Sequence, residues 1–215
     1  KPLLAPSLPD FATVTQENLA HYFDYYPTMG YALQTASYYP VPDEIHTAGS
    51  FQLGLSPVWV AESGRTQADF HAKFAQYFNQ GFQMREISAT PISGGETRFT
   101  GIWTQRTATN GWGARINEND AQYAATRTQT IQNGGRIADT FSYFVGGTRL
   151  HASIQVGDGV APTDDFFGLN LAGYATRSAA NAVAGLNPTS TSAEPAPANT
   201  FGGVFVPAAG DWLVD

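Results

Sequence analysis

The chain has 215 residues and 42% hydrophobic content, enough to bury a sizeable core, and we expect one structural domain. Its 11 basic and 18 acidic residues give a net charge of −7, and the basic residues form no cluster, which argues against nucleic acid and anionic membranes as partners. The absence of cysteine excludes disulfides and thiolate metal sites, and with the polar composition it predicts a secreted, extracellular protein. We expect no membrane span, no cofactor and no metal.

The chain begins with a proline-rich arm, predicted over residues 1–14. Pro2, Pro6 and Pro9 exclude a continuous helix, so we expect an extended segment that lies on the folded body. The first residue is Lys1 and no charged-then-apolar leader precedes it. We therefore expect a mature chain from which a leader has been removed.

The most regular stretch runs from Thr66 to Trp103. Four aromatic residues recur in it at the spacing of one helix face: Phe70, Phe74, Tyr77 and Phe78. This spacing predicts a helix over residues 66–80, ended by Gly81 in a left-handed conformation. Two strands, around residues 82–87 and 97–103, follow with a turn between them. The predicted building block is helix, strand, turn, strand.

This stretch is one of about three and a half copies of a repeat. The glycines that end the predicted helices, at positions 30, 81, 134 and 185, lie 51, 53 and 51 residues apart. After the arm we divide the chain into repeat 1 (15–57), repeat 2 (58–111), repeat 3 (112–169) and a degenerate partial repeat (170–215). All four parts are expected to belong to one structural domain.

Three segments between the predicted elements are rich in turn-forming or polar residues. Tyr38–Ser56 is predicted to be the longest loop. Gly157–Asp165 is predicted to be an acidic loop, in which an aspartate caps the next helix and the spacing fits no calcium-binding pattern. Asn187–Asn199 is rich in Pro, Ser and Thr, and we expect it to build no core.

The repeat pattern predicts the fold class. One helix–hairpin block cannot cover its own apolar face, so the copies are expected to pack around one core. The 14 Phe, 10 Tyr and 4 Trp of the chain supply such a core. We predict an α+β fold of helix–β-hairpin repeats, with an antiparallel sheet and helices on one side.

The repeats resemble a known family. The third copy contains these segments in order: Trp112-Gly113-Ala114-Arg115, a helix with Tyr123, Gly134-Gly135-Arg136-Ile137, Gly146-Gly147 and Thr148-Arg149-Leu150. Together with the second copy, which ends in Gly101-Ile102-Trp103, it resembles the bacterial tandem repeat domain, found ahead of the β-lactamase-like domain in secreted polyglycine hydrolases. The resemblance covers residues 58–156 well and 15–57 moderately. It implies secretion and a helper or binding role, without naming a ligand.

The chemistry of the attached hydrolase domains does not match this chain. Those domains use Ser-x-x-Lys, in which the lysine helps to activate the serine. Here Phe70 stands three residues before Lys73, and no Gly-x-Ser-x-Gly elbow occurs. We therefore predict no catalytic residue. The alternative is a hydrolase, peptidase-like, with an unrecognised site around His46 or His151.

Six residues are candidates for ligand binding: Arg98, Arg149, His151, His46, Trp59 and Trp112. The two arginines recur on equivalent strands, and with His151 they would form a polar row able to bind carboxylates or carbonyls. The alternative for each arginine is a pair with an acid of its own repeat, Glu96 or Asp139.

The remaining candidates lie elsewhere. His46 lies on the predicted long loop near two acids. Trp59 and Trp112 offer rings for stacking on sugar or peptide, although core packing is the favoured interpretation for both.

These observations predict a secreted, non-catalytic repeat module that binds a polymer, a peptide or a protein partner, and that is accessory to a serine hydrolase. A further alternative is a structural or assembly subunit. In that case the arm and the tail Asn187–Asp215 would bind neighbouring subunits and give an oligomer.

Overall fold

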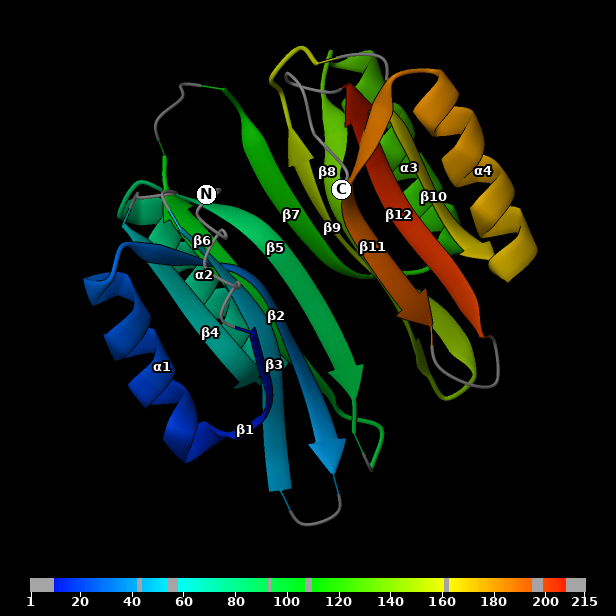
Figure 1. Cartoon of the computed structure of the whole chain (residues 1–215). Coiled ribbons are helices and arrows are strands. Elements are labelled where there is room, and N and C mark those ends of the chain that lie inside the picture. The colour runs from blue at the N-terminus through cyan, green and yellow to red at the C-terminus, as the bar shows by residue number, and fades with distance from the viewer. Residues whose placement is uncertain are drawn as a thin grey trace, which may run out of the picture. The chain divides into compact units, whose positions relative to one another are not determined.

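The computed structural model describes residues 10–41, 44–53, 58–92, 94–106, 110–160, 163–194 and 199–207. These residues form four helices and twelve strands, and each helix is preceded by a strand and followed by a hairpin (Figure 1). In chain order the elements are β1 (Asp10–Thr15), α1 (Gln16–Thr28), β2 (Tyr31–Val41), β3 (Glu44–Leu53), β4 (Trp59–Arg65), α2 (Gln67–Asn79), β5 (Phe82–Pro91), β6 (Thr97–Gln105), β7 (Trp112–Glu118), α3 (Asp120–Gln132), β8 (Arg136–Val145), β9 (Thr148–Val156), β10 (Asp164–Leu169), α4 (Leu171–Val183), β11 (Leu186–Glu194) and β12 (Thr200–Pro207). The predicted α+β repeat architecture is confirmed.

Four sets of strand, helix and hairpin are referred to below as repeats 1 to 4. The fourth set, predicted as a partial copy, has all its elements, because β10 pairs with β12 and so belongs with α4. In every repeat the last strand lies in the middle of a three-stranded antiparallel sheet, as in the order β4-β6-β5. The register shifts at two matching places in each sheet, once in each strand pair, as between Glu62 and Arg65 and between Met84 and Glu86. These shifts are β-bulges that bend each sheet in the same way.

The chain divides into two compact units, an N-terminal unit of residues 1–107 and a C-terminal unit of residues 108–215. Each unit holds two repeats, and the two repeats pack in the same way in both. In the N-terminal unit β2 contacts β4, β5 and β6, and in the C-terminal unit β8 contacts β10, β11 and β12. Leu33, Phe51 and Ile102 form a core cluster shared by both sheets of the N-terminal unit.

The middle strand of each repeat contacts its own helix, and in repeats 2 and 4 it also contacts a strand of the neighbouring sheet, β2 in the case of β6 and β8 in the case of β12. In β9 the four consecutive residues from His151 to Ile154 each have 0% exposure. His151 was predicted to belong to a polar row able to bind a ligand, but the His151 side chain is fully buried. Alternation along a strand separates its two faces, but it does not tell which of them is covered.

The helix boundaries follow local signals. Thr66 caps α2 by accepting a hydrogen bond from the Asp69 backbone N–H, and Asn119 caps α3 in a capping box with Gln122. The glycine after each helix is left-handed as predicted, with φ of +82° at Gly81 and +75° at Gly134. None of the helices in the described ranges is long and apolar enough to cross a membrane.

Several loop predictions are corrected by the structure. Within Tyr38–Ser56, residues 38–41 belong to β2 and residues 44–53 to β3. The Pro/Ser/Thr-rich stretch forms most of β11, and it buries Ser192. Both β2 and β11 are edge strands of their own sheets, where proline is tolerated because one side of the backbone needs no partner. Residues 10–14 of the predicted arm belong to β1, and residues 1–9 and 208–215 lie outside the described residues.

Candidate functional site

Backbone pairing shows which residues occupy equivalent places in repeats 2 and 3. Trp103 pairs with Val60 and Met84. Gln155 pairs with the matching residues of repeat 3, Gly113 and Ile137. Because α2 and α3 both have 13 residues and start after matching caps, Tyr77 of α2 is equivalent to Thr130 of α3. By the same alignment Phe82 is equivalent to Gly135.

In repeat 2 the space between helix and sheet is packed with aromatic rings. The ring centroid of Tyr77 lies 5.1 Å from that of Trp103 and 5.9 Å from that of Phe82. Trp103 has 0% exposure. Its ring fits because residue 101 is a glycine: a Cβ at Gly101 would lie 2.7 Å from the Trp103 ring. This is a close-packed protein interior in which the small residue is required by the large one.

Repeats 1 and 4 also fill this space with large side chains. In repeat 1 the ring centroid of Tyr26 lies 4.7 Å from that of Phe51 and 5.9 Å from that of Tyr31. In repeat 4 the equivalents of Phe82 and Trp103 are Leu186 and Phe205, which form a buried cluster with Phe166, and the equivalent of Tyr77 is the buried Asn181. Two or three large side chains therefore occupy these positions in each of the other three repeats.

Repeat 3 has a hollow of about 740 Å3 between helix and sheet, where smaller side chains stand in place of these rings. The large side chains are replaced there by Thr130, Gly135 and Gln155. The full lining consists of Gly111, Trp112, Gly113, Arg115, Ala125, Thr126, Gln129, Thr130, Asn133, Gly135, Gln155, Val156 and Gly157. Its volume falls within the roughly 300–1,000 Å3 typical of small-molecule sites. We call this cavity the third-repeat hollow. The N-terminal unit has a smaller hollow of about 500 Å3, lined by large side chains of repeats 1 and 2 such as Tyr31, Trp59 and Tyr77.

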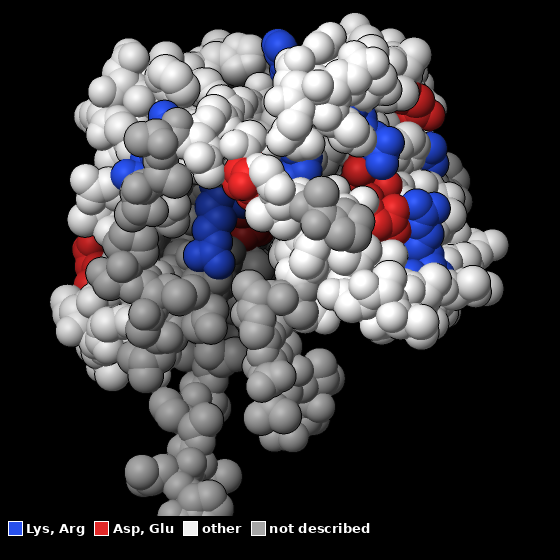
Figure 2. All heavy atoms as spheres, turned by 90° about the horizontal axis from the view of Figure 1, so that it is seen from above, with Lys and Arg blue, Asp and Glu red and all other residues white. Residues whose placement is uncertain are grey.

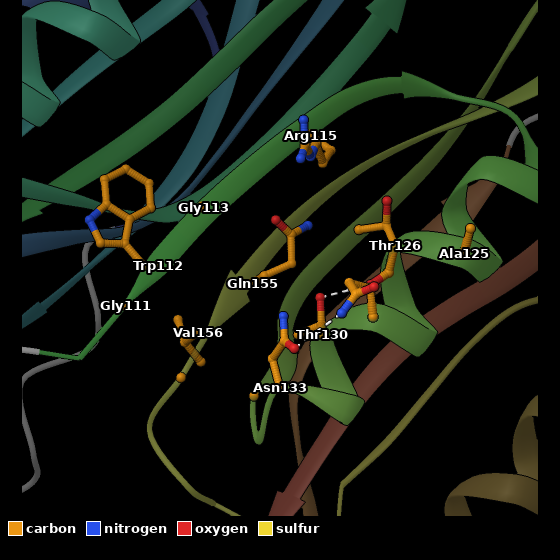
Figure 3. Close-up of a pocket in the computed structure, with 13 residues that line it drawn as sticks. Gly111, Trp112, Gly113, Arg115, Ala125, Thr126, Thr130, Asn133, Gln155 and Val156 are labelled. Carbon is orange, nitrogen blue, oxygen red and sulfur yellow. Dashed lines mark hydrogen bonds between the residues drawn. The ribbon is translucent and has the colours of Figure 1, made fainter.

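The third-repeat hollow has a strand wall and a helix wall (Figure 3). Trp112 lies on the strand side, Thr126 and Thr130 lie on the helix side, and Gln155 lies between them. The side-chain amide of Gln155 donates to Ser153 Oγ at 2.7 Å, and Ser153 stands where repeat 2 has Gly101. The tryptophan–glycine pair of repeat 2 is thus exchanged for a hydrogen-bonded glutamine–serine pair.

A second polar difference lies at the position of Glu62. In repeat 2 this carboxylate is 7% exposed and accepts hydrogen bonds from Tyr77 Oη at 2.5 Å and Arg65 Nε at 2.7 Å. Lys73 Nζ lies 3.2 Å away. Burial alone would raise the pKa of Glu62, but the bonds from Tyr77, Arg65 and Lys73 outweigh it and lower that pKa. Burial and the Glu62 carboxylate in turn raise the pKa of Tyr77 to about 12.

In repeat 3 the equivalent of Glu62 is the exposed Arg115, at the hollow. The equivalent of Lys73 is Thr126, whose hydroxyl donates to Glu118 Oε1 at 2.5 Å. The buried acid of repeat 2 is therefore absent from the lining of the hollow, and the one charged side chain among the lining residues is a cation.

His151, a predicted binding residue, lies in a buried cluster of side chains in repeat 3. Its Nδ1 lies 2.9 Å from Ser142 Oγ, and its Nε2 lies 2.8 Å from Asp120 Oδ1. Its ring stacks on Tyr123 at 4.7 Å between centroids. Serine, histidine and aspartate are the groups of a nucleophilic triad. Here, however, Ser142 is 1% exposed and Asp120 is the solvent-facing member, so the cluster ties β8, β9 and α3 together.

The strand register shows which residue of repeat 2 corresponds to His151. His151 pairs with Glu118, as Phe99 pairs with Arg65, so His151 is the equivalent of Phe99. Phe99 packs on Phe70 at 5.4 Å between centroids. The imidazole ring thus occupies a core position of the repeat.

The two arginine candidates lie in different sheets, β6 and β9. Arg98 pairs with Glu96 at 2.9 Å, as the alternative interpretation proposed. Arg149 lies 3.6 Å from Asp120 and over the ring of Phe167, 5.5 Å from its centroid.

The other two candidates lie in the N-terminal unit. Trp59 packs edge-on against Phe23 at 5.4 Å between centroids, within the core cluster of that unit. His46 lies in β3, where its backbone pairs with Thr15 and Tyr39, and not in a loop. Among the six candidates, Trp112 is the one that lines the third-repeat hollow.

The aspartates of the predicted acidic loop form ion pairs. Asp158 pairs with Arg136 at 2.7 Å, and Asp164 and Asp165, which lie in β10, pair with arginines of α4 and α3. The following helix is capped by Asn170, not by an aspartate. Figure 2 shows basic and acidic side chains lying next to one another on the face drawn. The described residues contain no cluster of three or more His, Asp or Glu that could hold a metal ion.

Sequence reasoning named Trp112 as a binding candidate, with core packing as the favoured interpretation, and it did not name Thr130, Gly135 or Gln155. The signal was present, because a residue-by-residue comparison of the copies exposes the exchange of Tyr77 and Trp103 for smaller, polar residues. Comparison with known families supports the repeat assignment itself. Residues 56–106 match the family model described as a polyglycine hydrolase-like, structural repeat. A comparison with curated proteins finds no match. Repeat 2 is thus a polyglycine hydrolase-like structural repeat, and the resemblance read from the sequence is confirmed for that part of the chain.

Proposed function

We propose that this chain is a non-catalytic binding module and that its binding site is the third-repeat hollow. One observation carries the proposal. Repeats 1, 2 and 4 each place at least two large side chains at the positions of Tyr77, Phe82 and Trp103, and repeat 3 has the larger hollow there, lined mainly by small and polar residues. Replacing the buried aromatic rings of a core by small polar side chains gives up packing and burial energy. A binding role accounts for keeping such a hollow.

The setting that we propose for this module is extracellular, accessory to a serine hydrolase. The family name of repeat 2 supports this setting, because it refers to polyglycine hydrolases. The chain lacks the Ser-x-x-Lys and Gly-x-Ser-x-Gly motifs of serine hydrolases, and its Ser142 hydroxyl is buried. The module would therefore hold a polymer, a peptide or a partner domain while another domain performs the chemistry.

A capture experiment tests the proposal. The chain is mixed with insoluble cellulose, chitin and xylan, and with an immobilised glycine-rich peptide, and the bound fraction is measured. The decisive variant is Ser153→Gly/Gln155→Trp, which copies the Gly101 and Trp103 arrangement of repeat 2 and fills the hollow. Thr128→Gln, on the exposed part of the same helix, is the matched control. Circular dichroism checks that all three proteins are folded.

We expect at least one of these materials to retain the native chain and the control variant. The affinity of the filled variant for the same material should be lower by about tenfold or more. Retention of the filled variant at the native level would contradict the assignment of the site. Retention of none of the proteins by any material would contradict the binding function.

A further inference from the structure

We propose that the third-repeat hollow holds its ligand by a carboxylate group, and that Arg115 is the residue that binds this group. The inference rests on the proposed binding function and names the chemical class of the ligand. That class is a monocarboxylate whose remainder carries hydroxyl or amide groups. Three features support it: two exchanged charges on β7, the lack of a partner for Arg115, and a stripe of uncharged polar residues on α3.

Repeat 3 carries two charges of repeat 2 in reversed order. In β4 the carboxylate of Glu62 forms an ion pair with Arg65. The equivalent residues of β7 are Arg115 and Glu118, because they stand at the same positions before the helix cap. No ion pair joins these two residues. Glu118 instead accepts a hydrogen bond from the Thr126 hydroxyl at 2.5 Å. The exchange therefore leaves the guanidinium of Arg115 without the carboxylate that its repeat 2 counterpart pair contains.

Arg115 is an exception among the basic residues of this acidic chain. Every other arginine in the described ranges, and also Lys73, interacts with a neighbouring residue. Arg115 lines the hollow and has no such partner among the residues that the structure describes. The described lining residues include no carboxylate. A ligand can supply the partner, because guanidinium N–H groups bind both oxygens of a carboxylate.

Arg115 and Gln155 face the same side of the sheet. The register pairs Gly113 with Gln155 and Arg115 with Ser153, and alternate residues of a strand share a face. The hydrogen bond from Gln155 to Ser153 at 2.7 Å agrees with this arrangement. In repeat 2 the equivalent Glu62 is contacted by side chains of α2, so this face of the sheet turns toward the helix. The charged group and the amide therefore belong to the same wall of the hollow.

The helix wall supplies uncharged polar groups. Its residues recur at the spacing of one stripe of α3: Thr126, Gln129, Thr130 and Asn133. Gln129 donates from Nε2 to Asn133 Oδ1 at 3.1 Å, which leaves Gln129 Oε1 as an acceptor and Asn133 Nδ2 as a donor for a ligand. Hydroxyl and amide groups can both donate and accept, so they suit this wall.

The position of Arg115 sets where the carboxylate lies and how much charge the ligand carries. Figure 3 shows Arg115 and Asn133 on opposite sides of Gln155. Asn133 is the C-cap of α3, where the helix dipole is negative and repels an anion. The carboxylate therefore belongs at the Arg115 end. One guanidinium matches one carboxylate, whereas a phosphate or a polyacid would bring further negative charge to a chain of net charge −7.

Calorimetric titration of the 215-residue chain tests the ligand class. The probes are two monocarboxylates, gluconate and N-acetylglutamine, and their uncharged counterparts, sorbitol and N-acetylglutaminamide. We expect at least one carboxylate to bind at least about tenfold more tightly than its counterpart, and added salt to weaken this binding. Comparison of the two carboxylates shows whether the remainder is recognised through hydroxyl or through amide groups.

Four variants test the role of Arg115. Arg115→Gln should remove the preference for the carboxylate, and Arg115→Lys should keep part of it, because the charge remains and the paired N–H groups are lost. Arg115→Glu/Glu118→Arg restores the order of repeat 2 without changing the net charge, and it should abolish carboxylate binding. Thr128→Ala, on the same helix but outside the lining, is the control and should leave the affinity unchanged. Circular dichroism checks that each variant is folded.

The outcomes separate the two proposals. Equal binding of the carboxylates and their counterparts, lost in the filled variant, would overturn the carboxylate assignment and leave the binding function standing. Carboxylate binding that survives in Arg115→Gln and in Arg115→Glu/Glu118→Arg would place the carboxylate elsewhere and overturn this inference. Binding of none of the four probes would also overturn it, and the capture experiment then decides the binding function separately.

Discussion

Repeats 2 and 3 share one backbone and differ in what fills it. Both have a 13-residue helix, a left-handed glycine after it, and the same two bulges in a three-stranded sheet. Repeat 2 closes this frame with Tyr77 and Trp103, and repeat 3 leaves it open with Thr130 and Gln155. The comparison shows that the backbone arrangement of the repeat is kept in repeat 3 although two of its large aromatic side chains are replaced by smaller ones. Substitutions that exchange the two states test this interpretation.

The largest effect is expected from Trp103→Gln, which places the glutamine of repeat 3 in the closed core of repeat 2. Trp103 is fully buried against Phe70 and Tyr77, so its removal leaves a cavity and loses transfer free energy. We expect a loss of about 3–5 kcal/mol in the free energy of unfolding, measured in urea by circular dichroism. Gln155→Ala, at the equivalent open position, should cost less than about 1 kcal/mol. Equal losses in the free energy of unfolding for Trp103→Gln and Gln155→Ala would contradict the difference in packing between repeats 2 and 3.

Gly101→Ala should be the next most damaging change. The added Cβ would lie 2.7 Å from the ring of Trp103, which has no room to move, and overpacking of this kind costs about 1–3 kcal/mol. The cost should fall to within about 1 kcal/mol in the Trp103→Gln background, because the clashing ring is then gone. Urea unfolding of the double-mutant cycle gives the coupling energy. If the losses in unfolding free energy of the two single variants add up to that of the double variant, the glycine at position 101 is not required by the Trp103 ring.

Glu62→Gln tests the buried acid that repeat 3 lacks. The bonds from Tyr77, Arg65 and Lys73 would lose their charge, with an expected cost of about 2 kcal/mol at neutral pH. The folded-state pKa of Glu62 is lowered from its ordinary value of 4.5, so the native group contributes its full stability above that pH and loses it as the pH falls through the lowered pKa. The native chain and the variant should therefore converge in acid. A stability gap that stays constant from neutral pH into acid would contradict the charged state of Glu62.

The smallest effects should be equal in the two repeats. Gly81→Ala and Gly134→Ala place a side chain at φ of +82° and +75°, with open space around each added Cβ. Only backbone strain changes, and each substitution should cost about 1 kcal/mol. Thermal unfolding of the two variants is the measurement. A clear difference between them would show that the frames of the two repeats are not the same.

The sequence predicted the frame well because its signals are local. Aromatic residues at helical spacing mark the first two helices, and a left-handed glycine follows each of the four. The predictions failed where a local signal had two meanings. Proline at Pro40 and Pro188 indicated loops, but both residues lie in edge strands, where proline is tolerated. His151 was assigned to a polar row able to bind a ligand, but Tyr123 of α3 stacks on its ring.

The hollow could not be predicted from one repeat alone, because it arises where large side chains of the other repeats are replaced by smaller ones. Thr130, Gly135 and Gln155 are ordinary residues for a helix, a turn and a strand. They gain meaning only beside Tyr77, Phe82 and Trp103, at positions that the register of the strands defines. Trp112 was predicted because tryptophan is conspicuous in any context.

The sheet topology has a consequence for how the chain folds. All strand pairs in the described residues join strands of the same repeat, so each sheet completes its hydrogen bonds within a short segment of chain. Short-range pairing lowers the contact order and favours rapid folding, with side-chain docking of finished sheets as a later step. Changes to the interior of one repeat then leave the hydrogen-bonded registers of the others untouched, which makes each copy an independent site for the evolution of new surfaces.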